Sequence, residues 1–361
     1  MSKINNKVKI MKHRIALIGC GGMATSHVRR FEDLYNRLEV AAIVDIDRER
    51  AENLAKLLPD KPKVFTDYHD ALPCCDVVLM ALPHHLHAQC TIDCLNAGKH
   101  VLAEKPLANN EEDCIDMIRA AKANSRILMV AYCMRFHPLL IKMKELITAE
   151  TYGKCFQLSI WTEQHTERTP DNWMCRKATL GGGQLFSHGC HYIDLMLWML
   201  GRPVIGTHIS SNMGTPWMER EGTSNVTITF ESGAMGYHFG TWGARGTRHG
   251  YAFHAHCEEG MLEFDLAAGK LYLHSNLSKH NPGENENSKI SVLAEAPSCK
   301  PTIQEMRHFL DCVETGATPI TNAIESLEGL KVIWKLYEAE DKMQIAHLKG
   351  YGFGTINPNN L

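Results

Sequence analysis

The stretch RIALIGCGGMA, from Arg14 to Ala24, contains the pattern that decides the fold of the first part of this chain. Its first half is apolar, and its second half matches Gly-x-Gly-x-x-(Gly or Ala), with glycines at Gly19 and Gly21. In a dinucleotide-binding turn the first glycine permits the tight bend, and the second lets a pyrophosphate approach the backbone. The small residue at the end lets helix and strand pack closely. The stretch therefore predicts a strand, a phosphate-binding turn and a helix whose N-terminus faces the phosphates.

An acidic residue at the end of the next predicted strand supports the same ligand. Asp45 follows the apolar run Val40–Val44, about 20 residues beyond the glycine pattern, where a carboxylate binds the adenosine ribose hydroxyls. A carboxylate repels a 2′-phosphate, so we expect NAD rather than NADP. Arg48 and Arg50 lie close to Asp45 in the sequence and weaken the expected preference for NAD.

The first third of the chain alternates between strands and helices. Predicted strands cover Arg14–Ile18, Val40–Val44, Val77–Ala81, His100–Ala103 and Ile127–Ala131, and predicted helices cover Met23–Tyr35, Arg48–Leu57, His85–Ala97 and Glu111–Ala123. Apolar strands that alternate with helices are typical of a parallel sheet covered on both faces. This pattern predicts a Rossmann domain.

The pattern changes after residue 134. Helices are predicted from Pro138 to about Ala149, from the glycine corner at 181–183 to Leu200, and over Ile303–Thr315 and Ala323–Lys342, and a long strand over Lys154–Thr166. Between Val204 and Val292 the chain reads as successive strands, including Thr223–Phe230, Ala234–Thr241 and Tyr251–Cys257, with a polar loop over 278–288. We predict an α/β protein with an N-terminal extension (1–12), a Rossmann domain with a parallel sheet (13–134), and a C-terminal α/β domain with a mostly antiparallel open sheet (135–361).

Composition limits the class of protein. The chain has 361 residues, 44% hydrophobic and 22% charged, with a formal net charge of −3, which is typical of globular proteins and gives no electrostatic footprint for nucleic acid. No membrane span or export signal is visible, and we expect the 13 cysteines to be reduced thiols of a cytoplasmic protein. The 20 histidines show no zinc-binding pattern, so we expect no metal.

Several segments carry a resemblance to a known family. They are DVVLMALPHHLHAQCTIDCLNAGKHVLAEKP (76–106), Arg-Phe-His-Pro (135–138), the three glycines 181–183 followed by His191 and Asp194, and Phe-Leu-Asp (309–311) followed by Thr315, Gly316 and Pro319. Over roughly residues 13–345 the chain resembles the glucose–fructose oxidoreductase/inositol dehydrogenase (Gfo/Idh/MocA) family. The resemblance implies sugar, inositol or related polyol substrates, and an open sheet that forms homodimers or homotetramers.

Lys105 is the first candidate for chemistry. It ends a predicted parallel strand, where ligands bind in open α/β sheets, and an ammonium there can stabilise negative charge on a substrate oxygen. The resemblance gives the Glu104-Lys105-Pro106 segment a catalytic lysine and a cis bond before the proline. A solvated lysine at a strand end is the alternative.

The helix before Leu200 supplies the second set of candidates. Ser187, His191 and Asp194 share one helix face by their spacing, and the surrounding residues are apolar, so we expect a buried Asp194 paired with His191 as general base. Many relatives carry Asp where this chain has Ser187. His188 is a candidate replacement, because a helix N-terminus disfavours its protonation, and packing beside the cofactor is the alternative.

The remaining candidates are weaker, and plain packing is an alternative for each. The cofactor site is predicted to comprise Gly19, Gly21, Gly22, Met23, Ala24, Asp45, Pro83, His84, His87, Glu104 and Lys105, with His84 standing where the family often has Asn or Thr. The substrate site is predicted to comprise Tyr132, Arg135, Trp161, Trp173, Arg176 and Ser187.

Together these patterns predict an NAD-dependent oxidoreductase acting on a secondary hydroxyl of a sugar or cyclic polyol, with His191 as base and Lys105 polarising the oxygen. Two alternatives stay open. One is a redox-neutral glycoside hydrolase or lyase that works by transient oxidation and elimination. The other is a non-catalytic NAD-binding regulator.

Overall fold

The first part of the molecule is a parallel sheet. The computed structural model describes residues 12–248, 250–276 and 288–361, so the predicted N-terminal extension and nearly all of the predicted polar loop lie outside the described residues. Six strands pair in parallel in the order β3-β2-β1-β4-β5-β6. They are β1 (His13–Ile18), β2 (Leu38–Val44), β3 (Lys63–Phe65), β4 (Val77–Met80), β5 (His100–Ala103) and β6 (Leu128–Val130). The order reverses beside β1, and ligands of open α/β sheets bind at the carboxyl ends of the strands at such a point.

Helices cover both faces of this sheet, because alternate strand residues point to opposite sides. Ile15 and Leu17 of β1 join one apolar cluster, and Ala16 and Ile18 join the other. The first cluster includes α1 (Gly22–Val28), α2 (Arg48–Ala55) and α9 (Thr302–Thr315), and the second includes α4 (His87–Asn96) and α5 (Glu111–Ala123). The predicted parallel sheet with two covered faces is confirmed.

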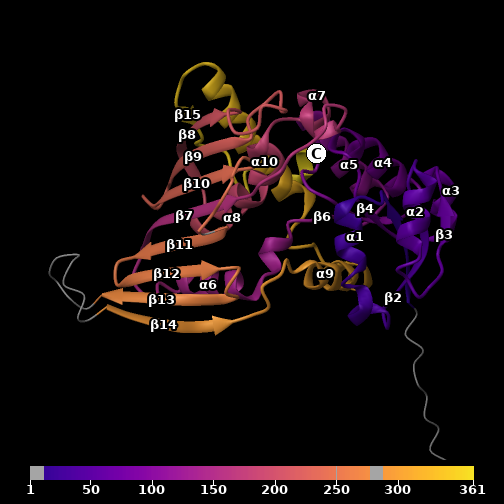
Figure 1. Cartoon of the computed structure of the whole chain (residues 1–361), viewed down its shortest axis with the longest axis horizontal. Coiled ribbons are helices and arrows are strands. Elements are labelled where there is room, and N and C mark those ends of the chain that lie inside the picture. Colours follow the sequence, from indigo (N-terminus) through magenta and orange to yellow (C-terminus); the bar gives the residue numbers. More distant parts are fainter. Residues whose placement is uncertain (1–11, 249, 277–287) are drawn as a thin grey trace, which may run out of the picture.

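α9 comes from the end of the chain but packs on the parallel sheet. Its residues Met306, Phe309 and Leu310 are buried among those of β1, β2 and α1, and Figure 1 shows α9 beside α1. A segment far along the sequence therefore helps to build the first part of the molecule. The domain bounds 13–134 and 135–361 remain a prediction.

The second part is a nine-stranded sheet in the order β14-β13-β12-β11-β7-β10-β9-β8-β15. Among the described strands of this sheet, only β7 and β10 pair in parallel, and all other neighbours are antiparallel. The strands are β7 (Cys155–Glu163), β8 (Pro203–Ser211), β9 (Thr223–Phe230), β10 (Met235–Thr241), β11 (Tyr251–Cys257), β12 (Gly260–Asp265), β13 (Lys270–Asn276), β14 (Ser288–Glu295) and β15 (Ala346–His347). The predicted fold class is therefore confirmed in both parts.

Three long helices cover one face of this second sheet. They are α6 (Pro138–Thr148), α8 (Cys190–Leu200) and α10 (Ala323–Asp341), and each contacts strands of the sheet. Two short helices, α3 (Tyr68–Ala71) and α7 (Lys177–Leu180), lie in connecting segments. The opposite face of the sheet carries exposed apolar side chains, among them Ile209 and Met235.

The helix predicted from the glycine corner to Leu200 is not uniform. Residues Leu185–Gly189 form a π-helical turn that leads directly into α8. Such turns insert an extra residue into the helix and are frequent at functional sites. The turn lies fully inside the protein, since all five of its residues are buried.

All thirteen cysteines lie in described parts of the chain, and each is a free thiol. In those same parts, no helix is both long and apolar enough to cross a membrane.

Candidate active site

The glycine-rich turn after β1 has the predicted shape. Gly19 has a φ of +91°, and a Cβ atom there would lie 2.3 Å from the carbonyl oxygen of Ala81. Both the backbone conformation and the close approach of Ala81, which follows β4, therefore require glycine at this position. Gly21 and Gly22 face open space instead, which leaves room for a ligand against the turn.

Asp45 fixes the same turn from the end of β2. Its carboxylate accepts hydrogen bonds from the backbone N–H of Cys20 at 2.8 Å and of Asp47 at 2.9 Å. The guanidinium of Arg50 lies 3.5 Å from it, whereas Arg48 lies 3.9 Å from Glu52 on the surface of α2. Asp45 and Arg50 both line a cleft over the carboxyl ends of the parallel strands. A carboxylate and a cation therefore face the predicted adenosine end of the ligand.

A cleft of about 630 Å³ lies over the carboxyl ends of the parallel strands. We call it the central cleft. Its walls come from the loops after β1, β2, β4, β5 and β6, from the N-terminal end of α9, and from the second part of the chain through residues such as Trp173 and His188. The cleft therefore joins the predicted cofactor residues to the predicted catalytic ones.

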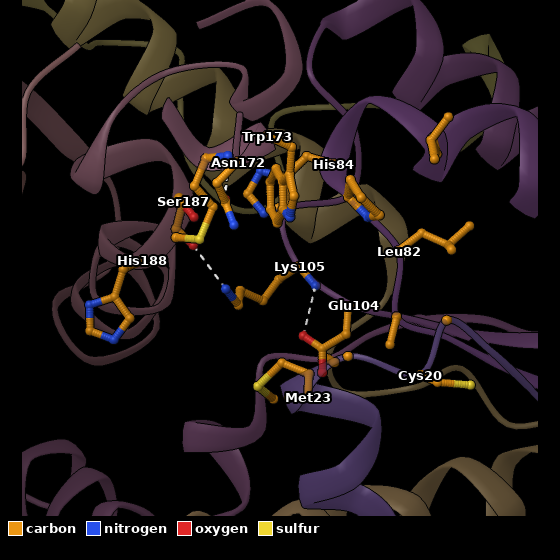
Figure 2. Close-up of a pocket in the computed structure, with 18 of the residues that line it drawn as sticks. Cys20, Met23, Leu82, His84, Glu104, Lys105, Asn172, Trp173, Ser187 and His188 are labelled. Atoms are coloured by element: carbon orange, nitrogen blue, oxygen red, sulfur yellow. Dashed lines mark hydrogen bonds between the residues drawn. The ribbon is translucent and has the colours of Figure 1, made fainter. Parts of the chain in front are cut away.

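Lys105 crosses this cleft. Its ammonium donates a hydrogen bond of 2.9 Å to the backbone carbonyl of Ser187, as Figure 2 shows. The peptide bond between Lys105 and Pro106 is cis, as the resemblance implies. Lys105 is thereby held between the parallel sheet and the π-helical turn.

Glu104 lies below the lysine in a buried pair. One carboxylate oxygen is 3.0 Å from the imidazole of His27, and the other accepts the backbone N–H of Lys105 at 3.3 Å. Burial opposes ionisation, but the hydrogen bond to His27 and the charge of Lys105 outweigh it and lower the pKa of Glu104. Glu104 is therefore an ionised support for the lysine.

Two histidines from the second part of the molecule line the cleft. The Nε2 atom of His188 lies 3.2 Å from the hydroxyl of Tyr251 and 3.4 Å from that of Tyr192. The ring of His191 packs edge-on to Tyr132, and its buried Nδ1 atom has no hydrogen-bond partner among the described residues.

Both imidazoles are neutral near pH 7. Burial lowers the pKa of His188 and His191 well below the ordinary value of a histidine, and the charges of Lys105 and Lys300 lower it further. The helix N-terminus was the predicted cause for His188, whereas burial is the leading one. Each ring is thus able to accept a proton.

The predicted pairing of His191 with Asp194 is wrong. Asp194 binds Arg135 instead, with two hydrogen bonds of 2.7 Å, and both side chains are buried. Arg135 also contacts Glu325 at 2.6 Å. A guanidinium offers two parallel donors to a carboxylate, which an imidazole cannot do, and this explains why Arg135 is the partner.

Several other predicted site residues do not reach the central cleft. Tyr132, Arg135 and Asp194 are buried and Arg176 is exposed, and none of the four lines the cleft. His87 lies with both ring nitrogens within 2.9 Å of backbone carbonyls, those of Pro106 and Leu82, so it joins two loops of the cleft instead of lining it. Trp161 contacts His254 and Tyr237 on the second sheet.

The remaining predicted residues do line the cleft. They are Gly19, Gly21, Gly22, Met23, Asp45, Pro83, His84, Glu104, Lys105, Trp173, Ser187, His188 and His191. Ala24 is buried behind the turn, where its small side chain allows α1 to pack on the sheet. His84 contacts the Trp173 ring, with the ring centres 4.8 Å apart, and the two lie together in Figure 2.

Sequence reasoning missed one side of the cleft. Lys300, Thr302 and Glu305, at the start of α9, line it, as do Gln164, Thr166, Arg168, Asn172 and Trp242. A signal for Glu305 does exist in the sequence. Met306, Phe309 and Leu310 follow the helical spacing of a buried face, and Glu305 stands one turn before Phe309 on that face.

Comparisons with known proteins agree with this architecture. A family model described as "Oxidoreductase family, NAD-binding Rossmann fold" (GFO_IDH_MocA) matches residues 13–132, and the GFO/IDH/MocA C-terminal domain matches residues 140–263. Among solved structures, levoglucosan dehydrogenase in complex with NADH has a TM-score of 0.82 and 21% identity, covering 94% of this chain and 99% of that one. Aldose-aldose oxidoreductase from Caulobacter crescentus, complexed with glycerol, has a TM-score of 0.80 and 25% identity, with 94% and 100% covered.

Curated relatives match over a shorter stretch. Inositol 2-dehydrogenase 2 of Saccharopolyspora erythraea is 26% identical over 62% of this chain and 65% of its own length. The inositol 2-dehydrogenase of Salmonella typhimurium is 27% identical over 53% and 55%. The family match confirms the predicted NAD cofactor, and the glycine turn, Asp45 and the open space at Gly21 fit such a dinucleotide. Since two models of one family together match more than half of the chain, the chain belongs to the GFO/IDH/MocA family of oxidoreductases.

Proposed function

We propose that this chain is an NAD-dependent oxidoreductase that oxidises a secondary hydroxyl of a sugar or cyclic polyol, or reduces the corresponding ketone. The observation that carries this proposal is the position of Lys105, whose ammonium lies in the central cleft beside two neutral imidazoles. The names of the curated relatives, which are inositol dehydrogenases, support the substrate class.

Different residues of the cleft have different roles in the proposed reaction. The glycine turn and Asp45 hold the dinucleotide, which supplies hydride transfer to or from the substrate carbon. Lys105 donates a hydrogen bond to the substrate oxygen and stabilises the negative charge that grows there. His191 accepts the hydroxyl proton on oxidation and returns it on reduction, since its neutral ring lines the cleft.

Trp173 and Ser187 are the residues we assign to substrate recognition. Both line the cleft between Lys105 and the second part of the chain. An aromatic ring packs against the apolar face of a sugar ring, and the serine hydroxyl can bind a substrate hydroxyl. Tyr132, Arg135, Arg176 and Asp194 have no place in this assignment, because they do not line the cleft.

A panel of polyols and glycosides tests the proposal, read both for NADH formation and for glycosidic cleavage. We expect net NADH formation with at least one polyol or sugar. Binding of NAD without turnover of any member of the panel would favour the non-catalytic regulator.

A redox-neutral glycosidase is the second candidate, and the second neutral imidazole favours it. The ring centres of His188 and His191 lie 6.2 Å apart in one cleft, and two bases suit oxidation followed by elimination. In that case the His188→Ala variant loses activity, and the native protein cleaves a glycoside without net NADH. If His188→Ala stays active and Ser187→Asp raises dehydrogenase activity, simple dehydrogenation stands.

We further propose a homo-oligomer that forms through the open face of the nine-stranded sheet, and a cytoplasmic location. Exposed apolar residues on that face support the first proposal, among them Ile209, Met235 and Ile290. Thirteen free thiols support a reducing compartment.

A further inference from the structure

Two buried polar side chains at the start of α9 lie against the central cleft without partners. Thr302 and Glu305 line the cleft and are only 2% and 0% exposed. Neither carboxyl oxygen of Glu305, nor the hydroxyl of Thr302, has a hydrogen-bond partner within the described parts of the chain. Buried polar groups are nearly always hydrogen-bonded, since leaving them unpaired is costly. These two side chains therefore lie where a ligand supplies the missing partners.

Glu305 lies at the reactive end of the cleft. Glu104, which follows β5, is close enough to raise the pKa of Glu305, and Glu305 is close enough to raise the pKa of Cys133, which follows β6. Asp45 lies on the other side of the glycine turn, after β2. A dinucleotide whose adenosine lies at Asp45 and whose reactive ring lies near Lys105 therefore presents its nicotinamide end to α9.

The protonation of Glu305 determines which partner fits. Burial raises its pKa well above the ordinary value, and the neighbouring carboxylate of Glu104 raises it further, with a partial offset from Lys300. A neutral carboxyl group has one O–H donor and one carbonyl acceptor side by side. It is complementary to a primary amide, which has a carbonyl acceptor and N–H donors in one plane.

We propose that Glu305 anchors the carboxamide of the nicotinamide, donating its O–H to the amide oxygen and accepting an amide N–H. This inference rests on the proposed function, because it takes the cofactor to be bound in the central cleft. Glu305 is then the residue that fixes the orientation of the nicotinamide carboxamide, while Lys105 and His191 act on the substrate.

Equilibrium binding of three dinucleotide probes tests the proposal without any substrate. NADH carries the carboxamide, the 3-acetylpyridine analogue of NADH lacks its N–H donors, and ADP-ribose lacks the nicotinamide entirely. We expect Glu305→Leu to weaken NADH binding roughly tenfold, equivalent to about 1.4 kcal/mol, with little change for ADP-ribose. Glu305→Gln, which keeps N–H donors beside a carbonyl acceptor, should retain most of the NADH affinity.

A matched control and the native protein complete the experiment. Arg307→Leu changes a half-exposed residue two positions along the same helix and should leave all three affinities unchanged. Native protein should bind the acetylpyridine analogue more weakly than NADH, and Glu305→Leu should remove that difference. We also expect Glu305→Leu to melt at an equal or higher temperature without ligand, because it removes an unpaired buried carboxyl group.

The outcomes separate this inference from the proposed function. Equal losses for NADH and ADP-ribose in Glu305→Leu would assign Glu305 a structural role and overturn the inference. So would native protein that binds the acetylpyridine analogue as tightly as NADH, a result that needs no variant. Failure of the native protein to bind any of the three probes would reject the NAD cofactor itself, and the anchor with it.

Discussion

Lys105 makes one side-chain hydrogen bond within the described residues, to the backbone carbonyl of Ser187. Removing the ammonium leaves that carbonyl, the glycine turn and Asp45 in place, so we expect Lys105→Ala to retain NADH binding. Turnover should fall by ~10²–10³-fold, the usual effect of losing one donor aimed at a developing negative charge. Steady-state rates and NADH titrations measure the two effects separately. Near-native turnover would support the non-catalytic regulator.

His191 should act as a base over an unusually wide pH range. Its pKa is lowered by burial and by the charges of Lys105 and Lys300, so the neutral ring persists as pH falls through the ordinary histidine value of ~6.5. We expect kcat/KM for oxidation to stay flat through that pH and to decline only when pH reaches the lowered pKa. His191→Ala should cost ~10²–10⁴-fold in kcat. A native pH profile with an inflection at or above the ordinary value would count against the assignment.

Asp45 sets the choice between NAD and NADP in our proposal, although Arg50 also lines the cleft. A carboxylate repels a 2′-phosphate, and the nearby guanidinium attracts it. We expect the native protein to bind NAD more tightly than NADP, and Asp45→Ser to narrow the difference. Dissociation constants for both cofactors with both proteins decide the matter. Tighter binding of NADP by the native protein would mean that Arg50 dominates.

At the scale of elements, the Arg135–Asp194 pair joins the turn after β6 to α8. Both side chains are 3% exposed, and the guanidinium also stacks 4.7 Å from the ring centre of Phe353. Asp194→Asn leaves the buried guanidinium of Arg135 with Glu325 as its one remaining acidic partner among the described residues, so it should lower the free energy of unfolding by about 3 kcal/mol. Chemical denaturation measures this loss, and the folded variant should keep much of its turnover. An Asp194→Asn variant with native stability and no turnover would instead indicate that Asp194 takes part in catalysis.

The elements that sequence predicted well are those with a local cause. β5, β9 and β11 have the predicted bounds, since apolar alternation and turn residues determine where such strands begin and end. The glycine turn was predicted for the same reason, because its whole pattern lies within the six residues from Gly19 to Ala24, and Gly19 has the positive φ that the tight bend requires.

What the sequence did not predict depends on distant partners. Asp194 and Arg135 are 59 positions apart, and helical spacing favoured the nearer His191 although a guanidinium is the better partner. The π-helical turn at Leu185–Gly189 has no signature in an apolar helix pattern. α9 packs on the parallel sheet although it lies near the end of the chain. The sequence therefore did not predict that Glu305 lines the cleft, although the helical spacing of Glu305 and Phe309 indicates that Glu305 is buried.

At the scale of the whole molecule, the central cleft is built from both sheets. The parallel sheet supplies Asp45 and Lys105, the helix-covered side of the second sheet supplies His188 and His191, and α9 closes the cleft with Glu305. The open face of the second sheet is therefore free to serve another purpose without disturbing the site.

The register of the nine-stranded sheet places several exposed apolar residues on that open face. Ile205 on β8 pairs with Thr229 on β9, which pairs with Met235 on β10, so these three side chains lie on the same face. At the far edge, His274 on β13 pairs with Ile290 on β14. Ile205, Met235 and Ile290 are 38%, 43% and 60% exposed, and Ile209 on the same strand as Ile205 is 70% exposed. Exposed apolar side chains on one face of a sheet are candidates for an interaction site, and two copies of such a face can bury each other in a symmetric assembly.

We expect the native protein to be a dimer or tetramer by light scattering coupled to size-exclusion chromatography. The double variant Ile209→Lys/Met235→Lys should shift to a smaller species, because each subunit would place unpaired charges in the interface. NADH binding should be retained, since neither residue lines the central cleft. Met343→Lys serves as the control, because Met343 is 94% exposed and follows α10 instead of lying on the sheet. A native monomer, or a double variant with the native mass, would show that this face is not the subunit interface.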